Sequence, residues 1–445
     1  MPQQGCAWPT LLPLILTALA CSSTHARTWS IYADGSGDVP TIQEAIGLAA
    51  SGDTILVGPG EYRGCLWIES KNIVLHSTAG PRSTVLRGAG AHSDPVVHFF
   101  FEASIGSTIE GFTVRNGTTG VACTSASPTI RGNIITDNHS ALGAGICCIW
   151  ESAARILDNV IADNEARHDC CFPSRGGGIY ADESSAAMIR GNLIANNRCI
   201  EQCDGGGISA FIAQIENNTI YGNRSDGPGG GIELPFDGAS VSNNIVVGNR
   251  SASFGDGIAV FRTADLACND VWGNGDQDYS GTDPGLWDFS ADPRFCGDPV
   301  QPSIMRGYVA PETYNLRADS PCLPGQHPAG ADCGLIGARP AGCPITSPSP
   351  RRERMTAPTV EVFPNPAFGQ TMMVRYRTPT AAPDITTAEV HDAAGRLVAR
   401  LKPSAPGLCR WDGRTDDGHP VSRGIYFVRV RSGSSVQTGT ILVAR

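Results

Sequence analysis

Aromatic and acidic side chains recur at one position of this sequence, as they would on a surface that binds sugars. Aromatic rings follow a repeated aliphatic residue by three or four positions, and carboxylates are interleaved with them. Flat ring faces stack on sugars while polar neighbours bond hydroxyl groups, so the set predicts a carbohydrate-binding stripe. The same spacing also suits rings that loops or a second domain cover, and both interpretations stay open. The predicted binding residues are Trp150, Tyr180, Glu183, Phe211, Glu233, Phe236 and Phe261.

A second cluster combines one histidine and four cysteines in the two longest insertions between repeats. Four nitrogen and sulfur ligands can hold zinc, but disulfides that staple neighbouring loops are favoured in an exported chain. No metal site and no cofactor are therefore expected. Cys123 and Cys148 occupy equivalent positions of adjacent repeats, and their oxidation state is left open because stacked neighbours rarely suit disulfide geometry. The cluster comprises His168, Cys170, Cys171, Cys199 and Cys203.

Lysine is almost absent from the chain, which bears on one kind of catalysis. Only Lys71 and Lys402 occur among 33 Lys and Arg residues. A lyase that removes a proton beside a carboxylate needs a Lys or Arg base, and Lys71 falls where we expect the N-terminal cap. Arg131, Arg155 and Arg190 lie on or beside predicted strands, where solvated structural arginines are the commoner case.

The composition excludes other classes of protein. The chain has 445 residues, a formal net charge of −10, 17% charged residues and 41% hydrophobic residues. This hydrophobic content is that of a folded protein, and the negative charge argues against binding nucleic acid through bulk electrostatics. The 53 glycines suggest a fold with many tight turns.

A unit of the form Ile-x-x-Asn-x-Ile-x-x-Asn recurs and predicts the architecture. Its first asparagines are 25 to 33 residues apart, and glycine-rich turns such as Gly176-Gly-Gly178-Ile179 precede the copies. Such a period indicates a solenoid or array, and the short β-branched segments suit coils of three parallel strands. Aliphatic residues should fill the interior, and both asparagine columns should be structural ladders. The columns are Asn133, Asn159, Asn192, Asn218, Asn244 and Asn269, and Asn138, Asn164, Asn197, Asn223, Asn249 and Asn274.

The repeat resembles the right-handed parallel β-helix family, whose fold is pectate-lyase-like, over residues 27–343. The resemblance implies an all-β solenoid. It does not specify an activity, since the family includes lyases, hydrolases, esterases, epimerases and non-catalytic surface proteins. The motifs of the polygalacturonase-like sites, which supply paired carboxylates, do not occur in the solenoid. We therefore identify no catalytic constellation, and an enzyme of this kind would be lyase-like.

Each end of a solenoid must be closed. A capping-box pattern at Thr41 and Glu44 predicts a helix through about Ala50 that plugs the N-terminal end. Four cysteines near the other end predict two disulfides. Four cysteines can pair in three ways, and the pair expected first is Cys322–Cys333. The predicted parts are the N-terminal cap and first coils (27–106), the regular repeats (107–276) and the closing segment (277–343).

Residues 1–26 have the features of a secretory signal peptide. The apolar run Leu11–Ala20 has the length of a signal core and is too short to span a membrane, and no later segment reads as transmembrane. The small residues of Thr24-His25-Ala26 predict cleavage before Arg27. Lipoprotein processing at Cys21 is the alternative. Removal of this segment leaves an even number of cysteines, 14 of 16.

A second domain follows a linker rich in Pro, Ser and Arg at residues 344–359. Alternating segments over residues 360–445 predict a small β-sandwich. This part resembles the C-terminal sorting domain of the type IX secretion system and the immunoglobulin-like domain of flagellar hook-capping proteins. The resemblance implies sorting or surface attachment, with the secretion machinery as partner. The matching residues are Pro364-Asn-Pro366, Asp392-Ala-Ala-Gly395-Arg396, Trp411-Asp-Gly413, Asp416-Asp-Gly418 and Gly424-Ile-Tyr-Phe427.

Together these features predict a bacterial protein that is secreted or displayed on the outer cell surface and binds polysaccharide or a cell-surface glycan. A polysaccharide lyase or related carbohydrate-active enzyme is one alternative. A structural surface adhesin is another. No nucleic acid partner and no transmembrane segment are expected.

Overall fold

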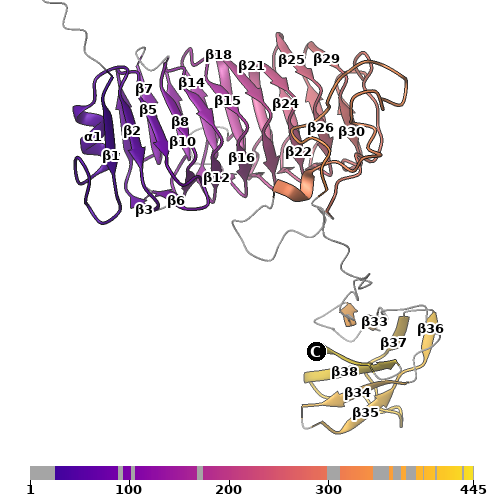
Figure 1. The fold of residues 1–445 in the computed structure, drawn as a ribbon. Coiled ribbons are helices and arrows are strands. Elements are labelled where there is room, and N and C mark those ends of the chain that lie inside the picture. The colour runs from indigo at the N-terminus through magenta and orange to yellow at the C-terminus, as the bar shows by residue number, and fades with distance from the viewer. Residues whose placement is uncertain are drawn as a thin grey trace, which may run out of the picture. The chain divides into compact units, whose positions relative to one another are not determined.

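The chain divides into two compact units, Met1–Pro344 and Ile345–Arg445, and each is described by itself. In the computed structural model the first unit is a solenoid of parallel strands, and the second contains antiparallel sheets (Figure 1). The structure describes residues 26–88, 94–101, 106–167, 174–297 and 311–343 of the first unit, and 360–363, 372–376, 387–393, 395–405, 408–432 and 435–443 of the second.

Several predictions concern residues outside these ranges. They are the signal peptide in residues 1–25, the linker at 344–359, the cluster residues His168, Cys170 and Cys171, and the Pro364-Asn-Pro366 motif.

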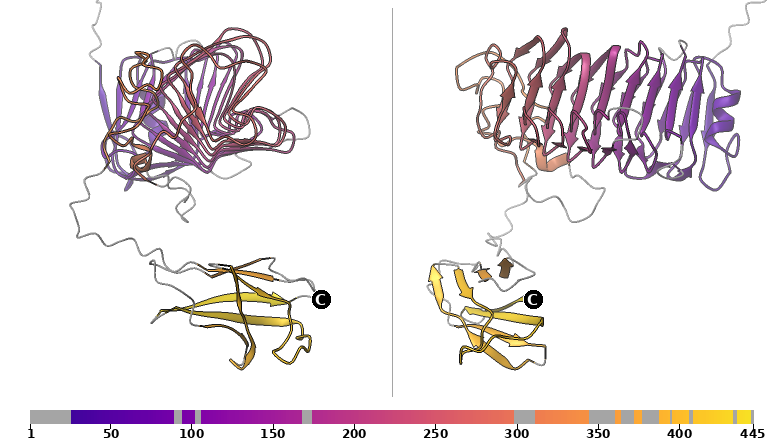
Figure 2. Two further views of the ribbon diagram at one scale, coloured as in Figure 1. Left: turned by 90° about the vertical axis from the view of Figure 1, so that its right-hand side faces the viewer. Right: turned by 180° about the vertical axis from the view of Figure 1, so that it is seen from behind.

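The first unit is a right-handed parallel β-helix, which confirms the predicted fold class. Viewed nearly along its axis, the successive coils superimpose (Figure 2, left). Most coils contribute two strands to one large sheet, sheet A. Its described strands are β1 (Thr28–Ile31), β2 (Thr54–Val57), β4 (Leu66–Glu69), β5 (Val74–Ser77), β7 (Val97–Phe100), β8 (Thr108–Glu110), β10 (Val121–Thr124), β11 (Thr129–Arg131), β14 (Ile146–Ile149), β15 (Arg155–Leu157), β18 (Ile179–Arg190), β21 (Ile208–Glu216), β24 (Ile232–Leu234), β25 (Ala239–Ser242), β28 (Ile258–Val260), β29 (Ala264–Ala267) and β31 (Tyr279–Ser280).

Two smaller parallel sheets complete the wall. Sheet B begins at Gly60 and runs to Trp272, and sheet C takes one strand from each coil between His139 and Ser251. Sheet B contains β3 (Gly60–Arg63), β6 (Thr84–Arg87), β9 (Thr113–Arg115), β12 (Ile134–Thr136), β16 (Val160–Ala162), β19 (Leu193–Ala195), β22 (Thr219–Tyr221), β26 (Ile245–Val247) and β30 (Asp270–Trp272), and sheet C contains β13 (His139–Ser140), β17 (Glu165–Arg167), β20 (Arg198–Ile200), β23 (Arg224–Ser225) and β27 (Arg250–Ser251).

The interior is filled by stacks of like side chains. Ile130, Ile156 and Ile189 are register partners on three neighbouring coils, and each is fully buried. Alternate residues along each strand point outward, because successive side chains of a strand lie on opposite faces. The repeated aliphatic position therefore determines the core, and the residues next to it determine the surface.

Both asparagine columns form buried ladders, as predicted. The side-chain amide of Asn159 donates to Oδ1 of Asn192 at 3.0 Å, and Asn192 donates in turn to Asn218 at 3.0 Å. Each amide also donates to a backbone carbonyl of the preceding coil, as Asn192 does to Ile156. Each Oδ1 also accepts a backbone N–H, as Oδ1 of Asn192 does from Asn159. Every buried polar atom of these amides therefore has a partner, which burial requires.

Each ladder ends on an aspartate of the closing turns. Asn269 donates its side-chain amide to Oδ1 of Asp288 at 3.0 Å, and Asn274 donates to Oδ1 of Asp278 at 2.8 Å. A carboxylate accepts hydrogen bonds and donates none. The aspartate therefore satisfies the last amide donor of the ladder and leaves no donor that would need an acceptor on a further coil.

The N-terminal end is closed by α1 (Ile42–Leu48). Thr41 accepts a hydrogen bond from the backbone of Glu44, and Ile42 and Ile46 are buried against the core, as predicted. The ammonium of Lys71 donates to the carbonyls of residues 46, 47 and 49 at 2.8–3.0 Å, so the one lysine of this unit neutralises the helix C-terminus.

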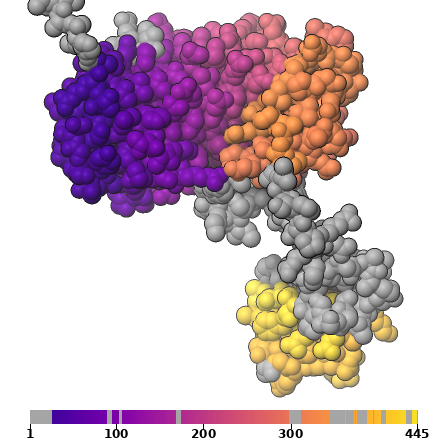
Figure 3. Space-filling model, in the orientation of Figure 1, coloured from indigo at the N-terminus to yellow at the C-terminus, as the bar shows by residue number. Residues whose placement is uncertain are grey.

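At the other end, the segment around η2 (Pro311–Tyr314) and residues 315–343 folds back over sheet B, where Tyr314 packs on β16 and β19 of the middle coils and Leu316 and Ile336 pack on β26 (Figure 3). The expected Cys322–Cys333 disulfide is wrong. Cys333 pairs with Cys268, in the last regular coil, and Cys296 pairs with Cys343. The sequence analysis considered only the cysteines of the closing segment, whereas this segment folds back along the solenoid. Cys322 stays reduced and bonds the buried carboxylate of Asp270.

The second unit contains two four-stranded antiparallel sheets around one apolar core. Trp411 and Tyr426, both from the predicted motifs, lie in that core with ring centroids 5.6 Å apart. Among the described residues of the whole chain, no helix has the length and apolar character needed to cross a bilayer. The strands are β32 (Val360–Phe363), β33 (Met372–Tyr376), β36 (Pro403–Ala405) and β37 (Leu408–Trp411) in one sheet, and β34 (Thr387–Asp392), β35 (Leu397–Arg400), β38 (Gly424–Ser432) and β39 (Ser435–Val443) in the other.

Removing one rung of a ladder should be costly. Asn192→Ala removes the acceptor of the Asn159 backbone N–H and side-chain amide, and it removes the side-chain donor to Asn218. These losses inside the core should lower the free energy of unfolding by about 3–5 kcal/mol. Urea denaturation measures the change. Glu183→Gln, an exposed substitution in the same coil, should stay within about 0.5 kcal/mol of wild type. Equal stability of the two variants would contradict a structural role for the ladder.

Candidate functional site

Exposed aromatic rings line the turn that follows the first strand of a coil in sheet A. Trp150 is 65% exposed after β14, Phe261 is 49% exposed after β28, and Phe236 is 45% exposed after β24. Phe101, which is 55% exposed, follows β7 at the same position. We call Phe101, Trp150, Phe236 and Phe261 the aromatic ridge.

Phe101 was missed by the sequence analysis because the repeat was recognised only from residue 109 onward. The register identifies it, since Phe100, Thr124 and Ile149 are partners on three successive coils. The residues that follow them are therefore equivalent, which places Phe101 two coils before Trp150.

The backbone is strained at two residues of the ridge and at the equivalent turn of the coil between them. Phe101, Ser125 and Trp150 have φ values of 66°, 49° and 58°, in the left-handed region that bulky residues avoid. Such a conformation costs roughly 1–2 kcal/mol for a residue with a Cβ atom. Inter-coil hydrogen bonds hold it, with Phe101 N donating to Thr124 O and Ser125 N to Ile149 O.

Trp150 is held by the neighbouring coil. Strand β18 has a register irregularity between Ala181 and Ala186, and this bulge contains Asp182 and Ser184. The Asp182 carboxylate accepts the backbone N–H of Trp150 at 2.8 Å, and Ser184 Oγ accepts that of Glu151 at 2.8 Å. The bulge therefore fixes the turn from which the indole projects.

Buried rings support the ridge from below. Phe236 stacks on Phe211 with ring centroids 5.0 Å apart and planes 21° apart, and Tyr180 meets Phe211 edge-on at 6.3 Å. Tyr180 and Phe211 are only 8% and 7% exposed. They therefore position the exposed ring of Phe236 and do not themselves offer a face to a ligand.

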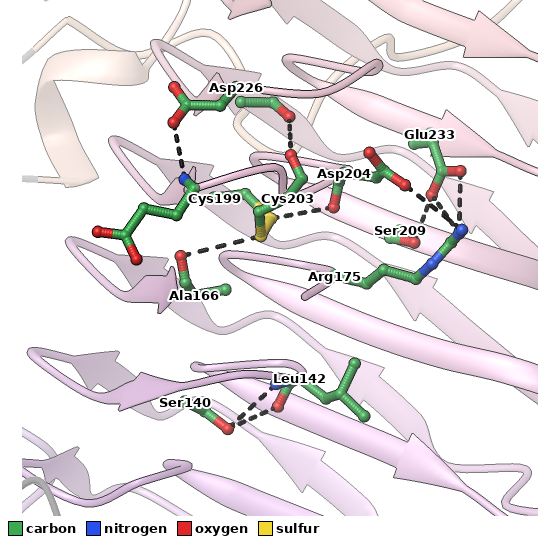
Figure 4. The surroundings of a disulfide bond; sticks show 12 residues. Ser140, Leu142, Ala166, Arg175, Cys199, Cys203, Asp204, Ser209, Asp226 and Glu233 are labelled. Carbon is green, nitrogen blue, oxygen red and sulfur yellow. Dashed lines mark hydrogen bonds and ion pairs between the residues drawn. A yellow bond between two sulfur atoms is a disulfide. The ribbon is translucent and has the colours of Figure 1, made fainter. Parts of the chain in front are cut away.

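Under these rings lies an ion-pair network built on Arg175 (Figure 4). Its Nη1 donates to both carboxylate oxygens of Glu233 at 3.1 and 3.2 Å, and its Nη2 lies 3.3 Å from Asp204. The hydroxyl of Ser209 also donates to Glu233. The Arg175 guanidinium lies over the Phe211 ring at 5.4 Å, so the network and the ring stack form one unit.

Burial determines the protonation of this network. The Glu233 side chain is 1% exposed, and burial raises its pKa to about 7, against the opposing effects of Arg175 and Ser209. Burial also raises the pKa of Asp204, which the Arg175 cation partly offsets. A carboxyl group with a pKa near neutrality can take up or release a proton, but Glu233 has almost no contact with solvent.

The predicted binding residues therefore fall into two groups, which periodicity alone could not separate. Four project outward and three lie beneath them as support. The outward group is Trp150, Glu183, Phe236 and Phe261, and the buried group is Tyr180, Phe211 and Glu233.

The cysteine cluster forms a disulfide in its described part. Cys199 and Cys203 pair with each other, with Cα atoms 5.0 Å apart. The predicted disulfide chemistry is confirmed for this pair, but the bridge closes one turn instead of stapling two loops, because both sulfurs face the same interior space beside Ala166. Cys123 and Cys148 stack in register and stay reduced. Among the described residues, no group of His, Cys, Asp and Glu is arranged to hold a metal ion.

Comparisons with known proteins agree with this fold. Residues 97–275 match the family model described as a right handed beta helix region. No curated protein matches the chain significantly.

Two solved structures from Porphyromonas gingivalis show short local similarity. One is PorZ, described as an essential bacterial surface component of the type-IX secretion system, with 23% identity and a TM-score of 0.17 over 19% of this chain and 11% of that one. The other is dimeric latent PorU, with 24% identity and a TM-score of 0.16 over 19% of this chain and 9% of that one. The chain thus spans about a tenth of either protein, and these overlaps describe a local likeness only.

The raised pKa of Glu233 predicts a pH dependence of stability. Between its usual value of 4.5 and about 7, the folded protein retains a proton that the unfolded chain has released. Stability should therefore fall as pH rises through this window, by roughly 3 kcal/mol. Glu233→Gln should remove this part of the slope, measured by urea denaturation at pH 4.5 and 7.5.

Glu183→Gln is the matched control, because Glu183 is exposed and should leave the slope unchanged. Asp270, whose pKa burial also raises to about 7, keeps its contribution in both variants. A Glu233→Gln variant with the wild-type slope would show that Glu233 is ionised in the folded protein throughout this range.

Proposed function

We propose that this chain is a secreted or surface-attached polysaccharide-binding protein, and that the aromatic ridge is its binding surface. The observation that carries the proposal is the placement of exposed aromatic rings at one turn of several coils, with Phe101 and Trp150 on strained backbone. Exposed aromatic faces beside polar groups suit sugar rings, which present apolar faces and hydroxyl edges.

The cost of this arrangement supports a binding role. Trp150 has a left-handed backbone, and its indole is 65% exposed, so neither its conformation nor its burial stabilises the fold. Strain of this kind persists only where surrounding contacts enforce it, and it concentrates at functional sites. Asp182 and Ser184 supply those contacts here.

Binding is favoured over catalysis because two candidate bases of the solenoid, Lys71 and Arg175, are engaged. Lys71 donates to three carbonyls at the end of α1, and Arg175 pairs with Glu233 and Asp204. A lyase base must be free to accept a proton. Neither side chain can do so without breaking the contacts that hold it.

Export and attachment complete the proposal. The signal-like residues 1–26 would direct the chain out of the cytoplasm, and residues 360–445 would serve sorting or attachment. The three disulfides of the described solenoid support an oxidising compartment. A surface location would present the ridge to glycans of the cell envelope or the surroundings.

Truncating the ridge should weaken glycan binding. A glycan array with the full chain would identify the bound polysaccharide, and calorimetric titration would give its affinity. Trp150→Ala and Phe236→Ala should each lower that affinity about tenfold, because each removes one stacking face.

Trp272→Ala is the control, since Trp272 is 37% exposed but lies on sheet B. It should bind like wild type. Absence of any glycan binding, or equal loss in the control, would refute the ridge as the binding surface.

A further inference from the structure

A buried carboxylate at the N-terminal end of the solenoid is held by neutral donors alone. Asp53 is 5% exposed and directly precedes β2, which lies with β1 and α1 at one end of the solenoid (Figure 1). Its Oδ2 accepts the indole N–H of Trp29 at 3.1 Å and the backbone N–H of Ala50 at 3.0 Å. Its Oδ1 accepts the backbone N–H of Arg27 at 2.7 Å. A buried carboxylate is normally paired with a cation.

The cationic side chains at this end of the solenoid are engaged elsewhere. The Arg27 guanidinium lies 3.6 Å from the ring centroid of Trp29 and 3.9 Å from Asp38. The Lys71 ammonium donates to three carbonyls at the end of α1. Among the described residues, no side chain forms an ion pair with Asp53. The hydrogen bond from the Arg27 backbone holds the pKa of the Asp53 carboxyl below its ordinary value, against the opposing effect of burial, so this group is ionised at neutral pH.

Arg27 is the first of the described residues to form hydrogen bonds with the solenoid. Its N–H donates to Asp53, and its carbonyl accepts the backbone N–H of Thr54 at 2.9 Å. Strand β1 then pairs with β2 from Thr28 onward. Ala26 is exposed, and it makes no hydrogen bond to any described residue. The peptide bond between Ala26 and Arg27 is therefore accessible, while the nitrogen on its far side is held against the carboxylate.

Hydrolysis of this peptide bond would turn the Arg27 nitrogen into a cation. Water adds across the bond, the Ala26 carbonyl becomes a carboxylate, and the Arg27 nitrogen leaves as an amine. That amine takes up a proton at neutral pH, because α-amino groups titrate at about 8. The ammonium would stand where the N–H now donates, 2.7 Å from Oδ1 of Asp53. Charge-assisted hydrogen bonds are roughly twice as strong as neutral ones.

We propose that export removes residues 1–26 and that the new α-ammonium of Arg27 forms an ion pair with the buried carboxylate of Asp53. The enzyme required is a signal peptidase, and its co-reactant is water. This ion pair rests on the proposed function through export alone, and not through the aromatic ridge. Cleavage before Cys21, the other processing site, would keep Arg27 in a peptide bond and leave Asp53 without a cation.

The ion pair would join the parts that close this end of the solenoid. Asp53 already holds β1 through Trp29 and the turn after α1 through Ala50. The carboxylate favours the charged form of the amine, so the amine should titrate at a higher pH in the folded chain than in the unfolded chain. The stability that it adds should be fully present below about pH 8 and should be lost as pH rises through the folded pKa.

The exported protein tests both steps. The full chain would be exported from a bacterial host, and mass analysis of its N-terminal peptide should identify Arg27 as the first residue. Its amines would then be methylated with isotope-labelled formaldehyde and titrated by NMR. Lys71 and Lys402 are the only lysines of the chain, so the α-amine signal is readily assigned. It should titrate about one pH unit higher in the folded protein than in urea.

Asp53→Asn should abolish this difference, because it removes the charge and keeps an oxygen acceptor. Asp38→Asn is the matched control, since it makes the same change in charge beside the Arg27 guanidinium, and it should keep the difference. Circular dichroism would verify that both variants fold, and the wild-type comparison with urea is decisive even if Asp53→Asn does not.

The outcomes separate this ion pair from the proposed function. A chain that stays in the cytoplasm would refute export and the ion pair together. An exported chain with a first residue other than Arg27 would refute the processing site alone. Arg27 as the first residue, with equal titration in folded and unfolded protein or with an unchanged difference in Asp53→Asn, would refute the ion pair and leave export standing.

Discussion

The solenoid depends on the satisfaction of buried amides. Each regular coil places two asparagines in the interior, and their polar atoms have no access to water. They can be accommodated only if the next coil supplies a matching asparagine at the same position, as Asn192 does for Asn159. This requirement fixes the register of the coils between Asn133 and Asn274, and the aliphatic side chains of those coils stack in the same register.

The same requirement explains how the solenoid ends. A ladder of asparagines always leaves one unsatisfied donor, and Asp278 and Asp288 accept from the last members. At the other end, α1 covers the first core layer and Lys71 satisfies the carbonyls that the helix leaves open. Polar closure at both ends lets a repetitive fold stop without exposing a sheet edge to further pairing.

Because the interior is fixed by repetition, the outward positions are free to vary, and they carry the distinctive chemistry. One outward turn holds exposed rings, and Arg198, Arg224 and Arg250 stack in register along sheet C. Both arrangements are unfavourable for folding, through left-handed backbone at Trp150 and like charges at Arg198, Arg224 and Arg250. The ladders provide a rigid frame on which such costs can be borne.

The sequence alone determined the fold, because inward positions repeat and their spacing reports the coil length. It also located the ladders and the helix at Thr41. Tertiary structure decided the rest. Whether Phe211 or Phe236 faces solvent depends on stacking between coils, and the partner of Cys333 depends on where the closing segment folds back. Arg198, Arg224 and Arg250 were not singled out in the sequence, and only the structure shows that they stack on successive coils. Charge pairing depends on which side chains the coils bring together.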